Sequence, residues 1–440
     1  MPAFSVGDTT SEPSLSDKVQ RYVPRTFRDR SKNKGGLFTA QSRSQPSDSG
    51  PSETLASKCI KVVIDNFAEF PVHENIPAKY LSKVTKGLSV DLDADIAAEF
   101  IFDENYWKRR CLEVIQQQNC QISQHGLMWK QLFLEKYVQK ALEDYEPAAD
   151  GSDSMGAVLK SVSSCQDYVF TLTIRQLLAH PDLEVLIHSL PNLTKLDLTY
   201  GVKKIGMKYD RLLFGMKISD ANCLAKCFVD AENLTTLVLQ SNLIDDDLLR
   251  MLMTGLIKNT QITHLDFSHN KITNHGVRLL AKLLGPDSVL TNLSLADNQI
   301  HAEGGRYLGR AIRDNDSLNH LNLRLNRLVD DGGRMLLEGM GNNSTITNLN
   351  LSANSLGSDS AASLAVILKD GASPLQSLDV SCNQFVNKDV EDIADALASN
   401  KMICSLDLRM NATQNDADVL ERIGAIIHRN ELYSQKSMDS

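Results

Sequence analysis

Three residues in the middle of the chain have types and spacing that could support nucleophilic chemistry. His264, Asp266 and Ser268 alternate along the sequence, and a serine activated by a histidine that a carboxylate orients is the arrangement of many hydrolases. On a strand, however, side chains two positions apart are separated by about 6.6 Å, because each residue advances ~3.3 Å. That separation is too long for a relay of hydrogen bonds. We therefore interpret the three residues as polar side chains on the surface of a strand.

Two further motifs have the spacing of a ligand site but lack its residues. Residues 151–156 have the glycine interval of a phosphate-binding loop, but Ala157 follows where a lysine is required. Cys223 and Cys227 lie four apart in a predicted helix, and no second pair follows that could complete a metal site. We interpret the two cysteines as buried apolar side chains. The sequence thus predicts no enzyme, no cofactor and no metal.

The strand that would hold His264 belongs to a short motif that occurs seven times. The motif reads L-x-x-L-x-L-x-x-N-x-L and runs from Leu234 to Thr413, which predicts a leucine-rich repeat. Alternate leucines place one face of a short strand in the core, and the asparagine side chain can bond backbone groups left unpaired where the chain turns. The asparagines, spaced 28 residues apart with one step of 29, should form a ladder of buried amides: Asn242, Asn270, Asn298, Asn326, Asn354, Asn383 and Asn411.

The second half of each repeat is predicted to be a helix. Apolar residues recur ten and fourteen positions after each asparagine, as Leu252 and Leu256 do after Asn242, and a spacing of four marks one helix face. The fold class is therefore α/β, a solenoid of 28-residue leucine-rich repeats with parallel strands inside the curve and helices outside. The extra residue of the longer unit is expected in the turn after Leu368.

Composition divides the 440 residues into five segments. Residues 1–53 are rich in Ser, Pro and Gly and are predicted to be a disordered basic arm. Residues 54–147 have helical periodicity and predict a small domain of about four helices. Residues 148–163 read as a linker, residues 164–430 as the solenoid with its caps, and residues 431–440 as a tail.

Three surfaces of the chain are candidates for binding a partner. The residues between the core leucines should point out of the inner sheet face, which is small, polar and without aromatic anchors, and such a face suits a broad contact with another protein. The candidates on this face are His264, Asp266, His320, Asn322, Arg324, Asn350, Asp379, Asp407 and Arg409.

The other two candidates are basic. An insertion lengthens the step from Leu196 to Leu237 to 41 residues, and insertions in repeat proteins often bind; its apolar residues could instead seal the first turns. In the arm, residues 17–34 hold seven basic side chains against two acidic ones, which suits either a solvated arm or an acidic partner surface. The basic candidates are Lys203, Lys204, Lys208 and Arg211 in the insertion and Arg25, Arg28 and Arg30 in the arm.

Charge and hydropathy narrow the class of partner. The net charge of −9 argues against nucleic acid as the main partner. No run approaches the ~20 apolar residues of a membrane span, so no membrane is expected. Eight cysteines without disulfide or metal spacing are typical of the cytoplasm.

The chain resembles two families. Its repeats resemble the ribonuclease-inhibitor-like class of leucine-rich repeats. The segments Phe67–Pro71, Ile76–Tyr80, Asp103–Cys111 and His125–Lys130 resemble the T-complex-associated testis-expressed family of leucine-rich repeat proteins, the family of subunit five of the axonemal nexin-dynein regulatory complex. This resemblance implies a non-enzymatic structural subunit in the cytoskeleton of cilia and flagella, which helps to regulate dynein-driven bending. The implied partners are other subunits of that complex, with tubulin or axonemal dynein as further candidates.

Two other functions remain open from the sequence. The segment from Phe70 to Leu88 faintly resembles an F-box, and would make the chain a substrate receptor of a ubiquitin ligase. Other members of the ribonuclease-inhibitor-like class activate GTPases, and Arg324 on the inner face would then be needed for stimulated GTP hydrolysis.

Overall fold

The computed structural model describes residues 54–71, 76–115, 121–145, 154–177, 180–201, 214–369, 373–412 and 417–438. The basic candidates of the arm and of the insertion, Arg25, Arg28, Arg30, Lys203, Lys204, Lys208 and Arg211, lie outside these residues. Residues 55–440 form one compact unit.

The unit begins with helices joined by short turns. They are α2 (Leu55–Asp65), α3 (Ala78–Gly87), α4 (Ala94–Phe100), α5 (Glu104–Val114) and α6 (Trp129–Glu143), with the 3-10 turn η3 (Ile122–Gln124) before α6. Asp93 and Asp103 begin α4 and α5, because each carboxylate accepts the backbone N–H two residues later at 2.9 Å. Trp107 is fully buried and packs on Phe133 with ring centroids 5.4 Å apart. The described part of 54–147 thus holds five helices, one more than the sequence predicts.

The predicted linker over 148–163 is wrong for its second half. Residues 154–163 belong to helix α7 (Ser154–Cys165), which the turn η4 (Gln166–Tyr168) follows. Val162 and Cys165 are fully buried, and α7 packs on α4 and α6. The Ser and Gly content of this stretch conceals one apolar helix face, which is why composition alone indicates a linker.

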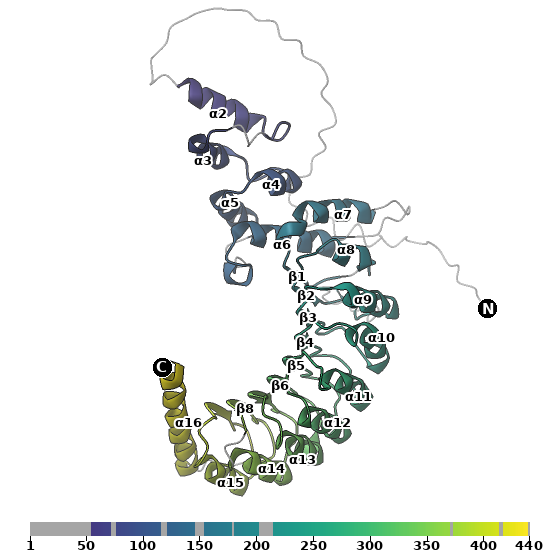
Figure 1. The fold of residues 1–440 in the computed structure, drawn as a ribbon, viewed down its shortest axis with the longest axis vertical. Coiled ribbons are helices and arrows are strands. Elements are labelled where there is room, and N and C mark those ends of the chain that lie inside the picture. Colours follow the sequence, from purple (N-terminus) through teal and green to yellow (C-terminus); the bar gives the residue numbers. More distant parts are fainter. Residues whose placement is uncertain are drawn as a thin grey trace, which may run out of the picture. The chain divides into compact units, whose positions relative to one another are not determined.

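Nine parallel strands form a single sheet in chain order in the described part of the chain (Figure 1). Each pairs with the next in the register that aligns equivalent leucines, for example Leu265 with Leu293 and Leu293 with Leu321. The strands line the inner side of the curve. They are β1 (Thr171–Ile174), β2 (Lys195–Leu198), β3 (Thr236–Val238), β4 (His264–Asp266), β5 (Asn292–Ser294), β6 (His320–Asn322), β7 (Asn348–Asn350), β8 (Ser377–Asp379) and β9 (Ser405–Asp407).

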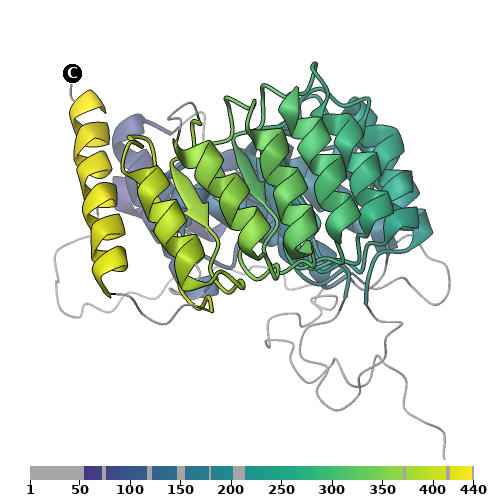
Figure 2. The same cartoon turned by 90° about the horizontal axis from the view of Figure 1, so that it is seen from below.

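The helices stand side by side on the outer side (Figure 2). The predicted apolar pairs are buried, as Leu308 and Ile312 show with no exposed surface, so the α/β leucine-rich repeat solenoid is confirmed. The helices are α8 (Glu184–His188), α9 (Ile218–Asp230), α10 (Asp246–Leu256), α11 (Asn274–Leu280) with the 3-10 turn η6 (Ala281–Leu284), α12 (Ala302–Arg313), α13 (Val329–Met340), α14 (Ser358–Lys369), α15 (Asn387–Leu397) and α16 (Ala417–Met438).

The last helix departs from the predicted boundary of the solenoid. It continues to Met438, so most of the predicted tail over 431–440 is helical. Ile423 of this helix is buried, whereas Leu420 is 46% exposed.

The seven ladder asparagines join successive turns of the solenoid. Asn298 is typical: its Oδ1 accepts the Ile272 N–H at 3.0 Å, and its Nδ2 donates to the carbonyls of Phe267 and Leu295 at 3.0 and 3.1 Å. The residue before each asparagine has a positive φ, such as 52° at Asp297, and this sharp turn leaves the strand's last carbonyls without a backbone donor. Six of the seven amides are buried, and Asn411, in the last unit, is partly exposed.

A second set of asparagines, which the repeat motif did not predict, stabilises the turn between the helix and the next strand in four units. Asn343 is buried, its Oδ1 accepts the N–H groups of Thr345 and Ile346, and its Nδ2 donates to the Ile312 carbonyl at 2.8 Å. The signal was present as an asparagine three positions before an apolar residue. The other members are Asn259, Asn315 and Asn400.

Removing one ladder amide should destabilise the solenoid measurably. We expect Asn298→Ala to lower the free energy of unfolding by about 2 kcal/mol, because the buried Ile272 N–H and the carbonyls that Asn298 serves lose their partner. Urea unfolding followed by circular dichroism measures the change. Asn292→Ala is the control, since Asn292 is only partly buried and its Oδ1 accepts a bond from the hydroxyl of the neighbouring Thr291. Equal losses for the two variants would contradict a structural role for the ladder.

Helices α12 and α13 touch through glycines. A Cβ atom on Gly339 would lie 2.0 Å from the Gly309 carbonyl oxygen, and one on Gly305 would lie 2.4 Å from that of Gly332. No side chain fits between the two backbones at these positions. Glycine is therefore required for this helix contact.

The free edge of β1 is closed by two carboxylates of α6. Glu135 Oε1 accepts the N–H groups of Phe170 and Thr171 at 3.0 and 2.8 Å, and Glu143 Oε1 accepts the Arg175 N–H at 2.7 Å. In the next strand, the corresponding N–H groups of Thr194 and Lys195 bond to the Phe170 carbonyl. The carboxylates of α6 thus stand where carbonyl groups of a preceding strand would otherwise accept these bonds.

Candidate functional site

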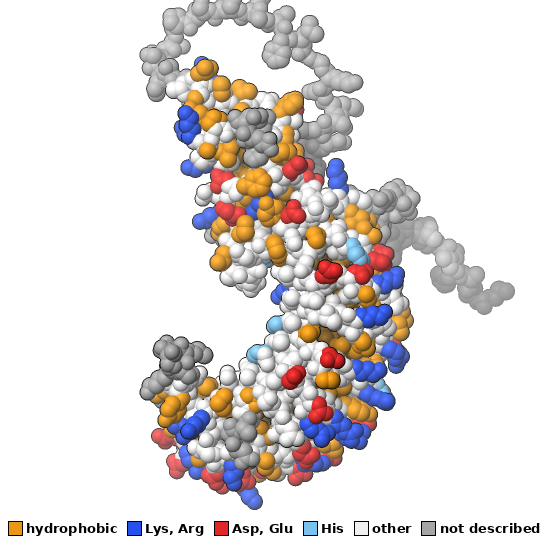
Figure 3. Space-filling view, in the orientation of Figure 1, with side chains coloured by type: hydrophobic (Ala, Val, Ile, Leu, Met, Phe, Trp, Pro, Cys, Tyr) orange, Lys and Arg blue, Asp and Glu red, His pale blue; other side chains and the backbone are white. Residues whose placement is uncertain are grey.

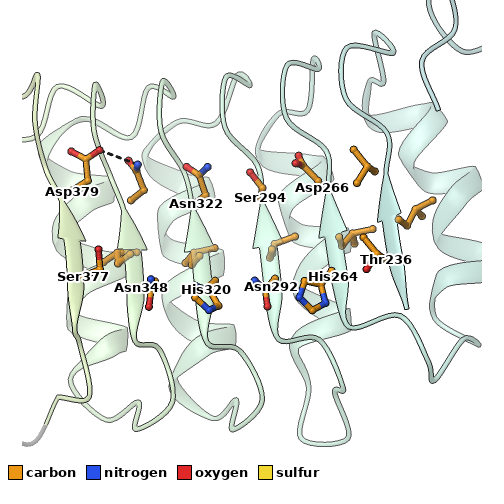
Figure 4. Close-up of a pocket in the computed structure, with 17 residues that line it drawn as sticks. Thr236, His264, Asp266, Asn292, Ser294, His320, Asn322, Asn348, Ser377 and Asp379 are labelled. Atoms are coloured by element: carbon orange, nitrogen blue, oxygen red, sulfur yellow. Dashed lines mark hydrogen bonds between the residues drawn. The ribbon is translucent and has the colours of Figure 1, made fainter. Parts of the chain in front are cut away.

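The inner face of the sheet carries its polar side chains in rows. Parallel register aligns His264, Asn292, His320, Asn348 and Ser377 in a first row, and Asp266, Ser294, Asn322, Asn350 and Asp379 in a second row. Together they line a shallow groove of about 440 Å³ that runs from β3 to β8 (Figure 4). We call this the concave groove.

The second row is held in place by the backbone. Asp266 Oδ1 accepts the N–H of Ser268 at 2.9 Å, and the same bond, from a side-chain oxygen to the amide two residues later, recurs at Asn322, Asn350, Asp379 and Asp407. Neighbouring units are also linked, because Asn350 Nδ2 donates to Asp379 Oδ2 at 3.0 Å. These bonds fix the side chains before any partner binds.

The charge of the concave groove comes from two carboxylates. Asp266 and Asp379 line it, and none of the described lining residues is Lys or Arg. Partial burial and the neighbouring His320 lower the pKa of His264, which disfavours its protonated, charged form. The groove therefore suits a partner that offers hydrogen-bond donors or positive charge.

The structure brings together most of the residues that the sequence predicts for this surface. His264, Asp266, His320, Asn322, Asn350 and Asp379 all line the concave groove. Arg324 is exposed beyond the strand end. Asp407 and Arg409 lie one unit farther on and pair with each other, with Arg409 Nη2 2.5 Å from Asp407 Oδ2, and the bonds from Arg409 lower the pKa of Asp407.

The geometry agrees with the interpretation of His264, Asp266 and Ser268 as strand polars. Each has a separate partner: Thr263 Oγ1 lies 2.8 Å from His264 Nδ1, Gln240 Nε2 donates to Asp266 Oδ2, and the Ser268 and Ser294 hydroxyls bond to each other. No relay of hydrogen bonds joins the three.

The interpretation of Cys223 and Cys227 as buried side chains is correct for Cys227 and wrong for Cys223, which is partly exposed. Cys223 Sγ lies 3.0 Å from Asp182 Oδ1, and Cys227 is buried. Within the described ranges, no three His, Cys, Asp or Glu side chains are placed to hold a metal ion. No helix found in those ranges has the length and apolar character needed to cross a bilayer.

The segment from Phe70 to Leu88, on which the ubiquitin-ligase alternative depends, is held within its own domain. Arg109 of α5 donates to the carbonyls of Thr85 and Leu88 at 3.2 and 2.6 Å. Arg109 also donates to the Lys86 carbonyl. These contacts attach the segment to α5 within the helical domain. Residues 72–75 of the segment lie outside the described part of the chain.

The helical domain contains a buried ammonium group that sequence reasoning did not predict. Lys130 is 1% exposed, and its Nζ lies 4.0 Å from the ring centroid of Tyr168 and 4.3 Å from that of Phe102. Burial lowers the pKa of Lys130 to about 8. A lysine in a helix is ordinarily read as exposed, and no local pattern reveals that aromatic rings from distant segments surround it.

Comparison with known proteins identifies the repeats. A family model described as Leucine Rich repeat matches residues 258–281, 288–309 and 314–337. Among solved structures, an internalin from Listeria monocytogenes aligns with a TM-score of 0.35 and 16% identity, covering 61% of this chain and 75% of the internalin. The repeat model and the observed strands and helices establish the fold without it.

Curated relatives share one name. The chain is 41% identical over 198 residues to dynein regulatory complex subunit 5 of Chlamydomonas reinhardtii, covering 45% of this chain and 50% of the relative. Proteins of the same name from Mus musculus and Homo sapiens are each 30% identical over 244 residues, covering 49% of this chain and 48% of theirs. The chain thus spans about half the length of the curated relatives it matches. It is a leucine-rich repeat protein whose curated homologues are named dynein regulatory complex subunit 5.

Proposed function

We propose that this chain is a non-enzymatic scaffold subunit of the nexin-dynein regulatory complex in ciliary and flagellar axonemes. In this proposal the concave groove binds a neighbouring subunit of the complex, and the chain thereby helps to regulate dynein-driven motility. The shared name of the curated relatives supports the complex, and the concave groove supports a role in binding.

The observation that carries the proposal is the continuity of the concave groove. Six successive strands, β3 to β8, contribute lining residues, and four of the second-row side chains are already fixed by backbone bonds. A shallow polar surface of this extent suits an extended contact in which many weak contacts add up, and it offers no deep pocket for a small substrate. The partner segment should present Lys or Arg side chains, or amide donors, to Asp266 and Asp379.

An isosteric double variant tests the contact. We expect Asp266→Asn with Asp379→Asn to reduce incorporation into axonemes at least about tenfold, because each lost pairing of a groove carboxylate with a partner cation costs about 1–3 kcal/mol. Asparagine keeps the side-chain oxygen that accepts the N–H of Ser268 or Ser381, so folding should be retained. The measurement is the amount of tagged protein in purified axonemes of a flagellated cell that lacks the endogenous protein.

The matched control makes the same charge change on the outer side. Asp359→Asn with Asp392→Asn alters two exposed carboxylates of α14 and α15 and should incorporate like the wild type. Equal losses in both double variants would refute binding through the concave groove. A wild-type chain that stays diffuse and purifies without axonemal subunits would refute the proposed complex as well.

A further inference from the structure

The outer helices repeat one arginine position in four successive units. Arg250, Arg278, Arg306 and Arg334 lie 28 residues apart, on α10 to α13. Three of them pair with a carboxylate one turn earlier: Arg250 with Asp247 at 2.7 Å, Arg306 with Glu303 at 2.9 Å, and Arg334 with Asp331 at 3.2 Å.

The α11 unit breaks this pattern. His275 occupies the position where the other helices have Asp or Glu, and Arg278 pairs with no carboxylate in the described part of the chain. Lys282 follows one turn later, and Arg310 and Arg313 lie on the adjacent α12; these three are likewise exposed and have no ion-pair partner within the described ranges. We call Arg278, Lys282, Arg310 and Arg313 the outer basic patch. Lys and Arg side chains gather over the outer helices in Figure 3.

A groove with polar and apolar walls borders the outer basic patch. Helix α11 ends at Leu280, continues as η6 to Leu284 and is followed by Gly285 and Pro286, so this unit has a shorter α-helix than its neighbours. The space beside it is a groove of about 360 Å³, with Ile257, Leu283 and Val289 on its apolar wall and Lys282 and Asp287 among its polar lining. Ile257 is 54% exposed and Val289 is 39% exposed.

We propose that the outer basic patch and this groove bind an acidic polypeptide segment that carries an apolar side chain. Carboxylates of the segment pair with Arg278, Lys282, Arg310 and Arg313, which repel one another while unpaired. The apolar side chain fills the groove beside Ile257 and Val289, with Lys282 at the rim. An apolar anchor favours a polypeptide over a nucleic acid, as does the net charge of −9.

This site lies on the helices, whereas the concave groove lies on the strands. Of the described lining residues, the two grooves have the buried Leu265 in common and no charged residue, so the outer site does not rest on the proposed function. Variants can test each surface without altering the other.

Defined probes test the proposal on the full chain. The first is a fluorescein-labelled peptide of glutamates with a central phenylalanine; an all-glutamate peptide of the same length and polyuridylate are the comparisons. Fluorescence anisotropy at low and physiological salt measures each Kd. We expect the phenylalanine peptide to bind most tightly, and its affinity to fall as salt screens the charges over about 10 Å.

Charge reversal locates the site. Arg278→Glu with Lys282→Glu should weaken binding of the phenylalanine peptide at least about tenfold, and Arg310→Glu with Arg313→Glu should do the same from the neighbouring helix. The control, Lys369→Glu with Lys388→Glu, makes an equal change of net charge at exposed positions on α14 and α15 and should leave the Kd within about twofold. Ile257→Ser should abolish the preference for the phenylalanine peptide over the all-glutamate peptide.

Three results would overturn the proposal. Equal weakening by the control would show that only the overall charge matters. Polyuridylate that binds as tightly as the phenylalanine peptide would identify a nucleic-acid surface instead. A wild type that binds both glutamate peptides equally, or an Ile257→Ser variant that still prefers the phenylalanine peptide, would remove the groove from the site.

Discussion

Glu135→Ala is expected to lower the free energy of unfolding by about 3–5 kcal/mol, the cost of leaving buried polar groups without their charged partner. Glu135 is 2% exposed and accepts the N–H groups of Phe170 and Thr171 as well as Gln131 Nε2. Its other oxygen pairs with His125 Nδ1. Alanine leaves all of these groups unpaired at the junction of α6 with the sheet.

Hydrogen exchange can assign the destabilisation by Glu135→Ala to β1, whereas an unfolding curve reports only the stability of the whole chain. The amides of Phe170 and Thr171 should exchange faster in Glu135→Ala, because opening β1 no longer breaks a bond to a carboxylate. Glu135→Gln keeps an acceptor and should be milder, and Glu113→Ala, at an exposed position of α5, should change little. Unaltered exchange at Phe170 and Thr171 would show that α6 does not close the edge.

Gly339→Ala is the second change with a large expected effect, a loss of about 3 kcal/mol from overpacking. Its Cβ would lie 2.0 Å from the Gly309 carbonyl oxygen, so α12 and α13 must separate. Alanine would otherwise stabilise a helix by up to about 1 kcal/mol relative to glycine. Urea unfolding measures the change in the free energy of unfolding. A decrease indicates that α12 and α13 are in contact at Gly339, and an increase indicates that they are not.

Gly424→Ala is the control with the opposite sign. Gly424 lies in α16, and a Cβ atom added there would have no neighbouring atom within 4 Å, so alanine should stabilise the chain by about 0.5–1 kcal/mol. If Gly339→Ala and Gly424→Ala both stabilised the chain, α12 and α13 would not be in close contact at Gly339.

Much of the solenoid was predictable because one pattern is repeated. The alternate leucines and the ladder asparagines recur at a fixed step, so a single unit determines the burial of Leu265 or Asn270 and its equivalents. Contacts between residues far apart in sequence could not be obtained in this way. Glu135 meets Phe170 across 35 residues, and nothing local marks that carboxylate as buried.

The candidate site shows the same limit. Alternation along the strands predicted which side chains face the concave groove, including His264, Asp266 and Asp379. The bonds that fix them, such as Gln240 to Asp266 and Asn350 to Asp379, depend on side-chain rotamers in adjacent units. The outer basic patch was not predicted from the sequence. The patch stands out only when α11 is compared with α10, α12 and α13, because α11 has His275 where those helices have Asp or Glu.

Closure of the first strand by α6 has a consequence for how this protein behaves at high concentration. Sheets with an open border recruit strands from other molecules, which is a common start of aggregation. With the amides of Phe170, Thr171 and Arg175 already bonded to carboxylates, an incoming strand would have to displace two acidic side chains to join ahead of β1. The carboxylates of Glu135 and Glu143 therefore prevent another strand from pairing with β1. Replacing Glu135 should promote self-association as well as unfolding.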